Sequence, residues 1–102
     1  MTERVPITDF HDGVDSDLQV FDVKGIRIAI AKVNGTFYAF DNTCTHLQCS
    51  LAEGKLDGSV VTCPCHGSQF DVTTGALLRG PAQEPVRSYP VEFENDRLQV
   101  EL

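Results

Sequence analysis

Residues 26–40 read IRIAIAKVNGTFYAF, the clearest structural signal in the chain. β-Branched residues stand at every second position in the first half, which is typical of a strand with two unlike faces. Asn34-Gly35 then separates this run from a second apolar run, and Asn-Gly between two such runs is a strong hairpin signal. The stretch therefore predicts two antiparallel strands, over residues 26–33 and 36–40.

Similar signals continue on both sides of this hairpin. Residues 18–23 alternate loosely before a Lys24-Gly25 turn, and a second hairpin joins residues 89–93 to 98–102. No stretch carries a sustained 3.6-residue apolar period, and prolines interrupt the region from 81 to 90. We therefore predict an all-β fold, an antiparallel β-sandwich or small barrel.

The middle of the chain, from Asp41 to about Pro85, differs in character. Five glycines punctuate short apolar pieces such as Val60-Val61, so this segment buries little apolar area for its length. Such a segment needs a staple, and a metal cluster is one. We expect a loop-rich, cluster-binding lobe over residues 41–85, inserted into a β-sandwich base, with residues 1–102 forming a single domain.

Composition limits the classes of partner. Fifteen acidic residues against eight basic ones give a net charge of −7, which argues against nucleic acid as a partner. No apolar run approaches the roughly 18 residues that span a bilayer. The first residues do not combine a basic segment with an apolar one, so we expect no secretion signal and a cytoplasmic location.

Two short loops carry the residues with metal chemistry. They are Cys44-Thr45-His46 and Cys63-Pro64-Cys65-His66, with 16 residues between them. Each loop offers one thiolate and one imidazole, from Cys44 and His46 in the first loop and from Cys63 and His66 in the second. A Cys₂His₂ set divided in this way is the ligand set of a Rieske 2Fe–2S centre, where two histidines hold one iron and two cysteines the other. With every position filled by protein, such a centre carries an electron but does not readily bind a substrate.

Zinc is the main alternative metal, because a tetrahedral Cys₂His₂ site suits it as well. Zinc fingers and ribbons, however, usually pair cysteine with cysteine in one knuckle and histidine with histidine in another. The mixed loops here favour two metals bridged by sulfide. A thioredoxin-like role for Cys63 and Cys65 fails because their spacing is CxC rather than CxxC. A zinc-stabilised binding module stays open as a second functional class.

The two loops resemble the cluster-binding boxes of the Rieske family. The similar segments are Cys44-Thr45-His46-Leu47-Gln48-Cys49, Cys63-Pro64-Cys65-His66-Gly67-Ser68, Phe70-Asp71, Thr74-Gly75, Gly80-Pro81-Ala82 and, upstream, Tyr38-Ala39-Phe40-Asp41. In length the chain is most similar to the soluble Rieske ferredoxins of bacterial multicomponent oxygenases that act on aromatic rings. The resemblance implies that Cys44 and Cys63 bind the buried iron, and that His46 and His66 bind the outer one.

Cys49 and Cys65 depart from the usual soluble ferredoxin. They match the disulfide-forming pair of Rieske proteins in quinol-oxidising cytochrome bc complexes. A disulfide here would clamp the two loops together and stabilise the fold by roughly 3 kcal/mol. Two reduced thiols are the alternative in a reducing cytosol. We favour the disulfide, because burial under the cluster would protect it from glutathione.

Two further residues bear on the reduction potential through the same resemblance. Ser68 stands where the high-potential proteins place a hydroxyl donor to a bridging sulfide, and Phe70 stands where they have a tyrosine hydroxyl aimed at a cysteine sulfur. Histidine ligation places the potential between roughly −150 and +300 mV. We expect an intermediate value, which a potentiometric titration at or below roughly −150 mV would contradict.

The resemblance also implies partners. The chain would carry electrons from a flavin-dependent NAD(P)H reductase to a terminal non-haem iron oxygenase, as a monomer without catalysis of its own. No charged residue occurs over 42–52 or 59–70. We therefore expect partners to dock on an uncharged tip beside Leu47 and Pro81, while acidic residues elsewhere steer the approach. A small Rieske subunit of a larger oxidoreductase is the alternative.

Overall fold

The computed structural model describes residues 4–7, 17–44, 49–65, 67–94 and 97–102. Within these ranges the chain forms eleven β-strands and one turn of 3-10 helix, with no α-helix. In order they are β1 (Arg4–Ile7), β2 (Leu18–Val23), β3 (Ile26–Val33), β4 (Thr36–Asp41), η1 (Leu51–Glu53), β5 (Lys55–Asp57), β6 (Val60–Thr62), β7 (Gln69–Asp71), β8 (Leu77–Arg79), β9 (Ser88–Tyr89), β10 (Val91–Glu94) and β11 (Arg97–Glu101). The all-β, antiparallel class agrees with the sequence analysis.

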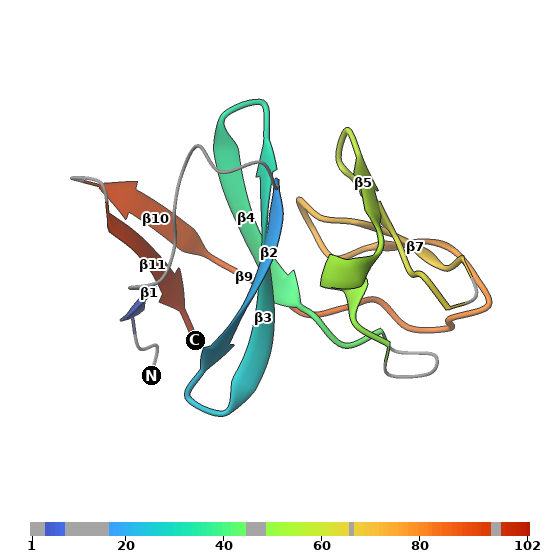
Figure 1. Ribbon diagram of the computed structural model, residues 1–102, viewed down its shortest axis with the longest axis horizontal. Coiled ribbons are helices and arrows are strands. Elements are labelled where there is room, and N and C mark those ends of the chain that lie inside the picture. The colour runs from blue at the N-terminus through green and yellow to red at the C-terminus, as the bar shows by residue number, and fades with distance from the viewer. Residues whose placement is uncertain (1–3, 8–16, 45–48, 66, 95–96) are drawn as a thin grey trace.

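The strands form three antiparallel sheets that succeed one another along the molecule (Figure 1). The outer base sheet has the order β1-β11-β10, and the central sheet has the order β2-β3-β4-β9. The third sheet, β5-β6-β7-β8, belongs to the lobe and lies on the far side of the central sheet (Figure 1). The base is thus a sandwich of two sheets, and the lobe adds a third layer.

The alternation within β3 explains why the central sheet is covered on both faces. Ile28 and Ile30 belong to the core shared with the outer base sheet. Ala29 and Ala31 belong to the core shared with the lobe, which includes the fully buried Phe70. Successive strand residues point to opposite faces. The small alanines leave room for the lobe to pack close, and the larger isoleucines fill the sandwich.

The hairpins predicted from the turn residues are confirmed. Lys24-Gly25 and Asn34-Gly35 all have positive φ, as a two-residue turn matching the strand twist requires. β2 and β3 have the expected bounds, and β4 runs one residue further than expected, to Asp41. The C-terminal hairpin joins β10 to β11 in antiparallel register. The strand expected over 89–93 is divided, because Ser88–Tyr89 pair with β4 as β9 and β10 begins after Pro90.

Several strands were not foreseen. β1 pairs with β11 at the edge of the outer base sheet, and the expected loop-rich lobe contains four strands of three residues each. A three-residue strand is too short to display an alternating pattern, so its formation depends on its neighbours in the sheet.

Within the described ranges, no helix has the length and hydropathy to cross a membrane.

Candidate functional site

The first ligand loop, residues 42–50, leaves the central sheet at the end of β4 and leads into η1. An isolated antiparallel bridge joins Thr43 to Ser50 where the two ends of the loop come together, a region we call the neck of the loop. The Cys44 N–H donates to the Cys49 carbonyl oxygen at 2.8 Å, which closes the loop beyond that bridge. Cys44 is only 1% exposed, so its sulfur is held in the core between base and lobe.

The second ligand loop, residues 63–68, connects β6 to β7 within the lobe sheet. The Cys63 N–H donates to the Ser68 carbonyl oxygen at 2.8 Å, and the Gly67 N–H donates to the Cys63 carbonyl oxygen at 3.1 Å. Gly67 has φ +81°, a left-handed conformation that glycine adopts without strain. Cys63 is 3% exposed, whereas Pro64 and Cys65 are exposed.

A close approach fixes the chain that leaves η1 against the start of the second ligand loop. A Cβ on Gly54 would collide with the carbonyl oxygen of Thr62, the residue before Cys63. Only glycine allows the two backbones to pass so closely. The exit of the first ligand loop and the entry of the second therefore lie side by side.

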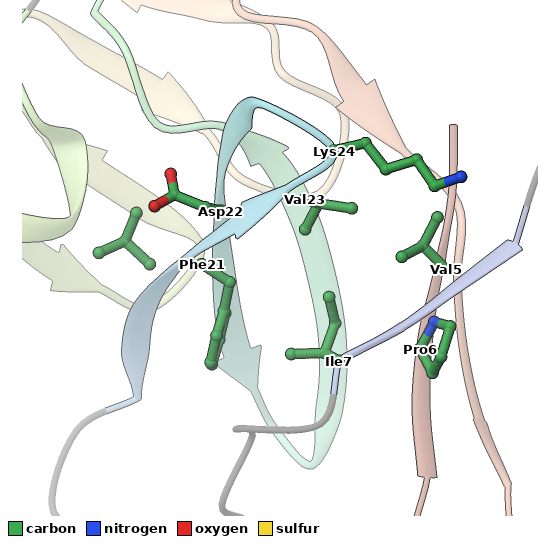
Figure 2. Close-up of a pocket in the computed structure, with 8 residues that line it drawn as sticks. Val5, Pro6, Ile7, Phe21, Asp22, Val23 and Lys24 are labelled. Carbon is green, nitrogen blue, oxygen red and sulfur yellow. The ribbon is translucent and has the colours of Figure 1, made fainter.

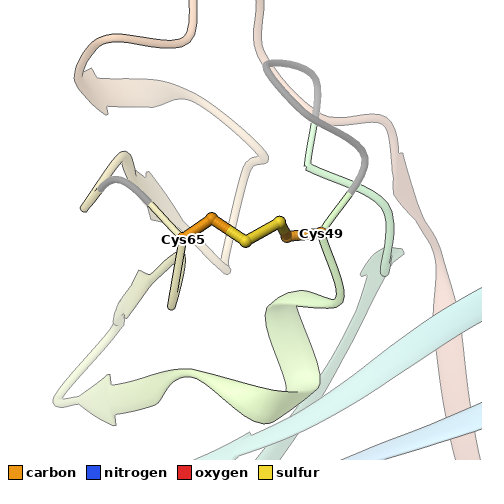
Figure 3. Close-up of a disulfide and its surroundings, with 2 residues drawn as sticks. All are labelled: Cys49 and Cys65. Carbon is orange, nitrogen blue, oxygen red and sulfur yellow. A yellow bond between two sulfur atoms is a disulfide. The ribbon is translucent and has the colours of Figure 1, made fainter.

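A disulfide between Cys49 and Cys65 joins the two ligand loops, as the sequence analysis favoured (Figure 3). The reason given for it is wrong, because Cys65 is exposed and burial does not protect that end of the bond. The two Cα atoms are 6.4 Å apart, within the range usual for disulfides. The Cys63 sulfur lies within 4.8 Å of both sulfurs of the bond. Because Cys49 and Cys65 are bonded to each other, they offer no thiolate, and Cys44 and Cys63 are the cysteines outside the disulfide.

Ser68 is fully buried at the end of the second ligand loop. Its hydroxyl oxygen accepts a hydrogen bond from the Ala82 N–H at 3.0 Å. This bond fixes the side chain and brings in a third segment, Gly80-Pro81-Ala82, which contains a cis Gly80–Pro81 peptide. A hydroxyl that accepts one bond keeps its own proton to donate. The role expected for Ser68, donation to a sulfide, stays a prediction.

The other predicted residues are placed as follows. Phe70 is fully buried in β7, opposite Val61 of β6, where its ring contributes hydrocarbon and no hydrogen-bond donor. Pro81 is exposed. His46, His66 and Leu47 lie outside the described residues.

The donor set fits an iron–sulfur cluster. The two buried cysteines, Cys44 and Cys63, belong to the same hydrophobic core, and each stands in a loop that also carries a histidine. The disulfide holds these loops together without using either sulfur. The assignment of Cys44, His46, Cys63 and His66 as the ligands stays a prediction, which the burial of Cys44 and Cys63 supports.

A buried tyrosine anchors the strand that enters the first ligand loop, a role that the sequence analysis missed. The Tyr89 hydroxyl donates to Asp41 Oδ1 at 2.6 Å, and the Asp41 N–H donates to the Arg87 carbonyl oxygen at 2.8 Å. Burial raises the pKa of Tyr89 to about 12, with help from the hydrogen bond to Asp41 and its negative charge, against the opposing charge of Arg87. Asp41 lies in a segment that resembles the Rieske family, but nothing in the sequence points to its hydrogen-bond partner, Tyr89, which lies 48 residues away.

We expect Tyr89→Phe to lower the free energy of unfolding by about 1.5 to 3 kcal/mol, the usual worth of a hydrogen bond to a charged group. The folded pKa of about 12 lies above the ordinary value of 10, so ionisation of Tyr89 favours the unfolded chain. Its contribution is complete below pH 10 and is lost between pH 10 and 12. Urea unfolding at neutral and alkaline pH measures both effects.

Tyr38→Phe is the matched control, because Tyr38 is the other tyrosine of the chain. It should keep the alkaline loss of stability that Tyr89→Phe removes. Equal pH dependence in wild type and Tyr89→Phe would contradict the assignment.

A groove of about 430 Å³ lies elsewhere, between the edge strands β1 and β2. Figure 2 shows Ile7 reaching from β1 toward β2 across this groove. The lining residues are Val5, Pro6, Ile7, Val20, Phe21, Asp22, Val23 and Lys24. This lining offers neither thiol nor imidazole, so the groove is distinct from the candidate metal centre.

Comparisons with known proteins agree with this site. A model of the Rieske [2Fe-2S] domain matches residues 4–90. The ferredoxin component of the naphthalene 1,2-dioxygenase system of Pseudomonas putida is 37% identical over 100 residues, which cover 98% of this chain and 93% of that protein. Both matches favour an iron–sulfur centre over zinc.

Two solved structures extend the likeness to the fold. The Sphingomonas yanoikuyae B1 ferredoxin aligns with a TM-score of 0.80 at 34% identity, covering 86% of this chain and 87% of that one. A chain in the complex of reduced oxygenase and oxidized ferredoxin in carbazole 1,9a-dioxygenase aligns with a TM-score of 0.78 at 37% identity, covering 81% and 78%.

Proposed function

Because the chain belongs to the Rieske [2Fe-2S] family and is an electron carrier of the ferredoxin type, we propose a specific route for its electrons. It accepts them one at a time from a flavin-dependent NAD(P)H reductase and delivers them to a terminal non-haem iron oxygenase. The observation that carries this proposal is the match to a dioxygenase ferredoxin component over 98% of the chain and 93% of that relative. In this role the chain is not itself an enzyme.

Four residues would hold the 2Fe–2S cluster, with Cys44 and Cys63 on one iron and His46 and His66 on the other. When bound, the cluster supplies a one-electron couple whose potential histidine ligation raises. The chain's own contribution is to bury both thiolates and to hold their loops at a fixed separation. We propose one cluster per chain and one Rieske domain over residues 1–102, with the cluster-binding lobe at about residues 41–85.

The loops around the cluster suit a docking surface for protein partners. Residues 42–52 and 59–70 contain no Asp, Glu, Lys or Arg, and Pro64 and Pro81 are exposed. An uncharged surface lets a partner approach closely without burying an unpaired charge, which would be costly. The net charge of −7 on the remainder can steer a basic partner toward it. We propose that the carrier acts as a monomer in the cytoplasm.

Stopped-flow spectroscopy with purified partners tests the route directly. We expect NADH and a dioxygenase-system reductase to reduce the carrier, and a matching terminal oxygenase to reoxidise it. Both steps should saturate with partner concentration, because each needs a docked complex. A carrier that is loaded with cluster but exchanges electrons with neither partner would contradict the proposed function.

Replacing Leu47 by aspartate tests the docking surface. We expect Leu47→Asp to slow electron delivery to the oxygenase by about tenfold or more, because a carboxylate buried without a partner at the contact costs more than the roughly 1–3 kcal/mol of an unpaired neutral group. The measurement is the apparent second-order rate constant at constant ionic strength.

Ile26→Asp is the matched control, since it places the same charge on a partly exposed aliphatic residue of β3, in the base. The control should leave the rate within a factor of two of wild type. Equal rates for Leu47→Asp and wild type would show that partners do not dock at this tip.

A further inference from the structure

We propose that Asn42 is a positioning residue for the cluster, which fixes the neck of the first ligand loop and thereby the place of Cys44. The proposal rests on the proposed function, because it assumes that Cys44 is a cluster ligand. Asn42 precedes Cys44 by two residues and is not itself an iron ligand in this proposal. Its role follows from four hydrogen bonds that meet at this one residue.

The side chain of Asn42 makes two of these bonds. Its Nδ2 donates to Ser50 Oγ at 2.9 Å, and its Oδ1 accepts from the Ala52 N–H at 2.8 Å. Asn42 is only 2% exposed, so water has little access to this site. Removing the amide would leave the Ser50 hydroxyl and the Ala52 N–H without these hydrogen bonds, which costs free energy. Ser50 ends the first ligand loop and Ala52 lies just beyond it in η1, so the amide ties the two ends of the loop together.

The main chain of Asn42 makes the other two bonds. Its N–H donates to the Arg27 carbonyl oxygen at 3.0 Å, and its carbonyl oxygen accepts from the Leu51 N–H at 2.8 Å. Arg27 lies in β3 of the central sheet, and Leu51 begins η1 and is fully buried. One residue therefore joins the base sheet, the entry of the loop and its exit.

The order imposed at Asn42 continues toward the ligand. The next pair, Thr43 and Ser50, forms the isolated bridge, and in the following pair the Cys44 N–H bonds to the Cys49 carbonyl oxygen at 2.8 Å. The neck thus consists of three successive backbone pairs, and the pair that contains Asn42 is the one nearest the base. A displacement of Asn42 is therefore passed to Cys44 through the two pairs that follow.

Asn42 complements the disulfide rather than duplicating it. The Cys49–Cys65 bond holds the first ligand loop to the second, whereas the Asn42 amide holds the two ends of the first loop together. The disulfide therefore restrains the distance between the two loops, and Asn42 restrains the shape of the loop that carries Cys44. Asparagine suits the position because one planar amide offers a donor and an acceptor together, which neither aspartate nor leucine does.

Two variants and a control test the proposal on the cluster-loaded protein. Asn42→Leu removes both side-chain bonds at similar volume, and Ser50→Ala removes only one. We expect Asn42→Leu to release its iron to a chelator about 10- to 100-fold faster than wild type, the usual effect of losing a residue that orients a metal ligand. Its reduced EPR spectrum should broaden, because Cys44 then occupies a spread of positions. Ser50→Ala should change both readouts in the same direction and by less.

Thr43→Ala is the matched control, since Thr43 is exposed and contributes to the neck through its backbone. It should match wild type in both readouts. If Asn42→Leu does not fold, the chelation rate and the EPR line width of Ser50→Ala still test the positioning role. Wild-type chelation rates and line widths in the two test variants would overturn the positioning role. A wild-type protein that assembles a cluster but exchanges electrons with no partner would overturn only the proposed function.

Discussion

Cys63→Ser is expected to leave the protein without its cluster, with neither visible absorbance from iron–sulfide nor an EPR signal after reduction. The Cys63 side chain is 3% exposed in the core between base and lobe. Serine fills nearly the same volume, but its hydroxyl does not ionise near neutral pH and does not replace a thiolate on iron. A loss of folding stability should follow, because a bound metal centre contributes to the free energy of folding.

Cys65→Ser is the matched control for that change. It makes the same chemical substitution two residues away, at a cysteine that belongs to the disulfide. Iron and sulfide analysis should find a cluster in Cys65→Ser and none in Cys63→Ser. If both variants retain the cluster, Cys63 is not a ligand. If the pattern is reversed, the roles of the two cysteines have been exchanged.

Removing the Cys49–Cys65 disulfide is expected to lower the free energy of unfolding by roughly 3 kcal/mol. The bond joins residues 16 apart, and in the chain-entropy account a cross-link across a loop of that length restricts the unfolded chain by about this amount. The loss should be accompanied by a lower reduction potential, because the loops then admit more water to the cluster. Urea unfolding and potentiometric titration measure the two effects.

The double variant Cys49→Ala/Cys65→Ala is preferable to either single variant, because it leaves no unpaired thiol beside Cys63. Mild reduction of the wild-type protein is the second arm and should give the same change in unfolding midpoint. Cys65 is exposed, so a reductant can reach one sulfur of the bond. An unchanged midpoint in both arms would show that the disulfide does not hold the lobe together.

The base of the fold was predictable because its signals are local. The turn at Asn34-Gly35 requires positive φ at two adjacent residues, and the sequence places there the pair that tolerates it best. The alternation of Ile28 and Ala29 likewise follows from strand geometry, and the structure uses both faces. The disulfide was also predictable, from the resemblance of the two ligand loops to the Rieske boxes.

The supports of the site were not predictable, because they join residues that are not neighbours in the chain and that no motif pairs. Ser68 bonds to the backbone of Ala82, 14 residues on, and Tyr89 bonds to Asp41 across 48 residues. Asn42 carries no motif of its own, and its importance is visible only when Ser50 and Ala52 return to it. Such bonds form only when the chain folds back on itself, which no local pattern encodes.

EPR spectroscopy of the reduced protein, combined with iron and sulfide analysis, distinguishes a Rieske centre from a zinc site and from an all-cysteine cluster. We expect two irons and two sulfides per chain, as a [2Fe-2S] centre requires, and the low average g value that histidine ligation gives. Bound zinc with no EPR signal, or the higher average g value of an all-cysteine cluster, would show that this chain is not a Rieske electron carrier.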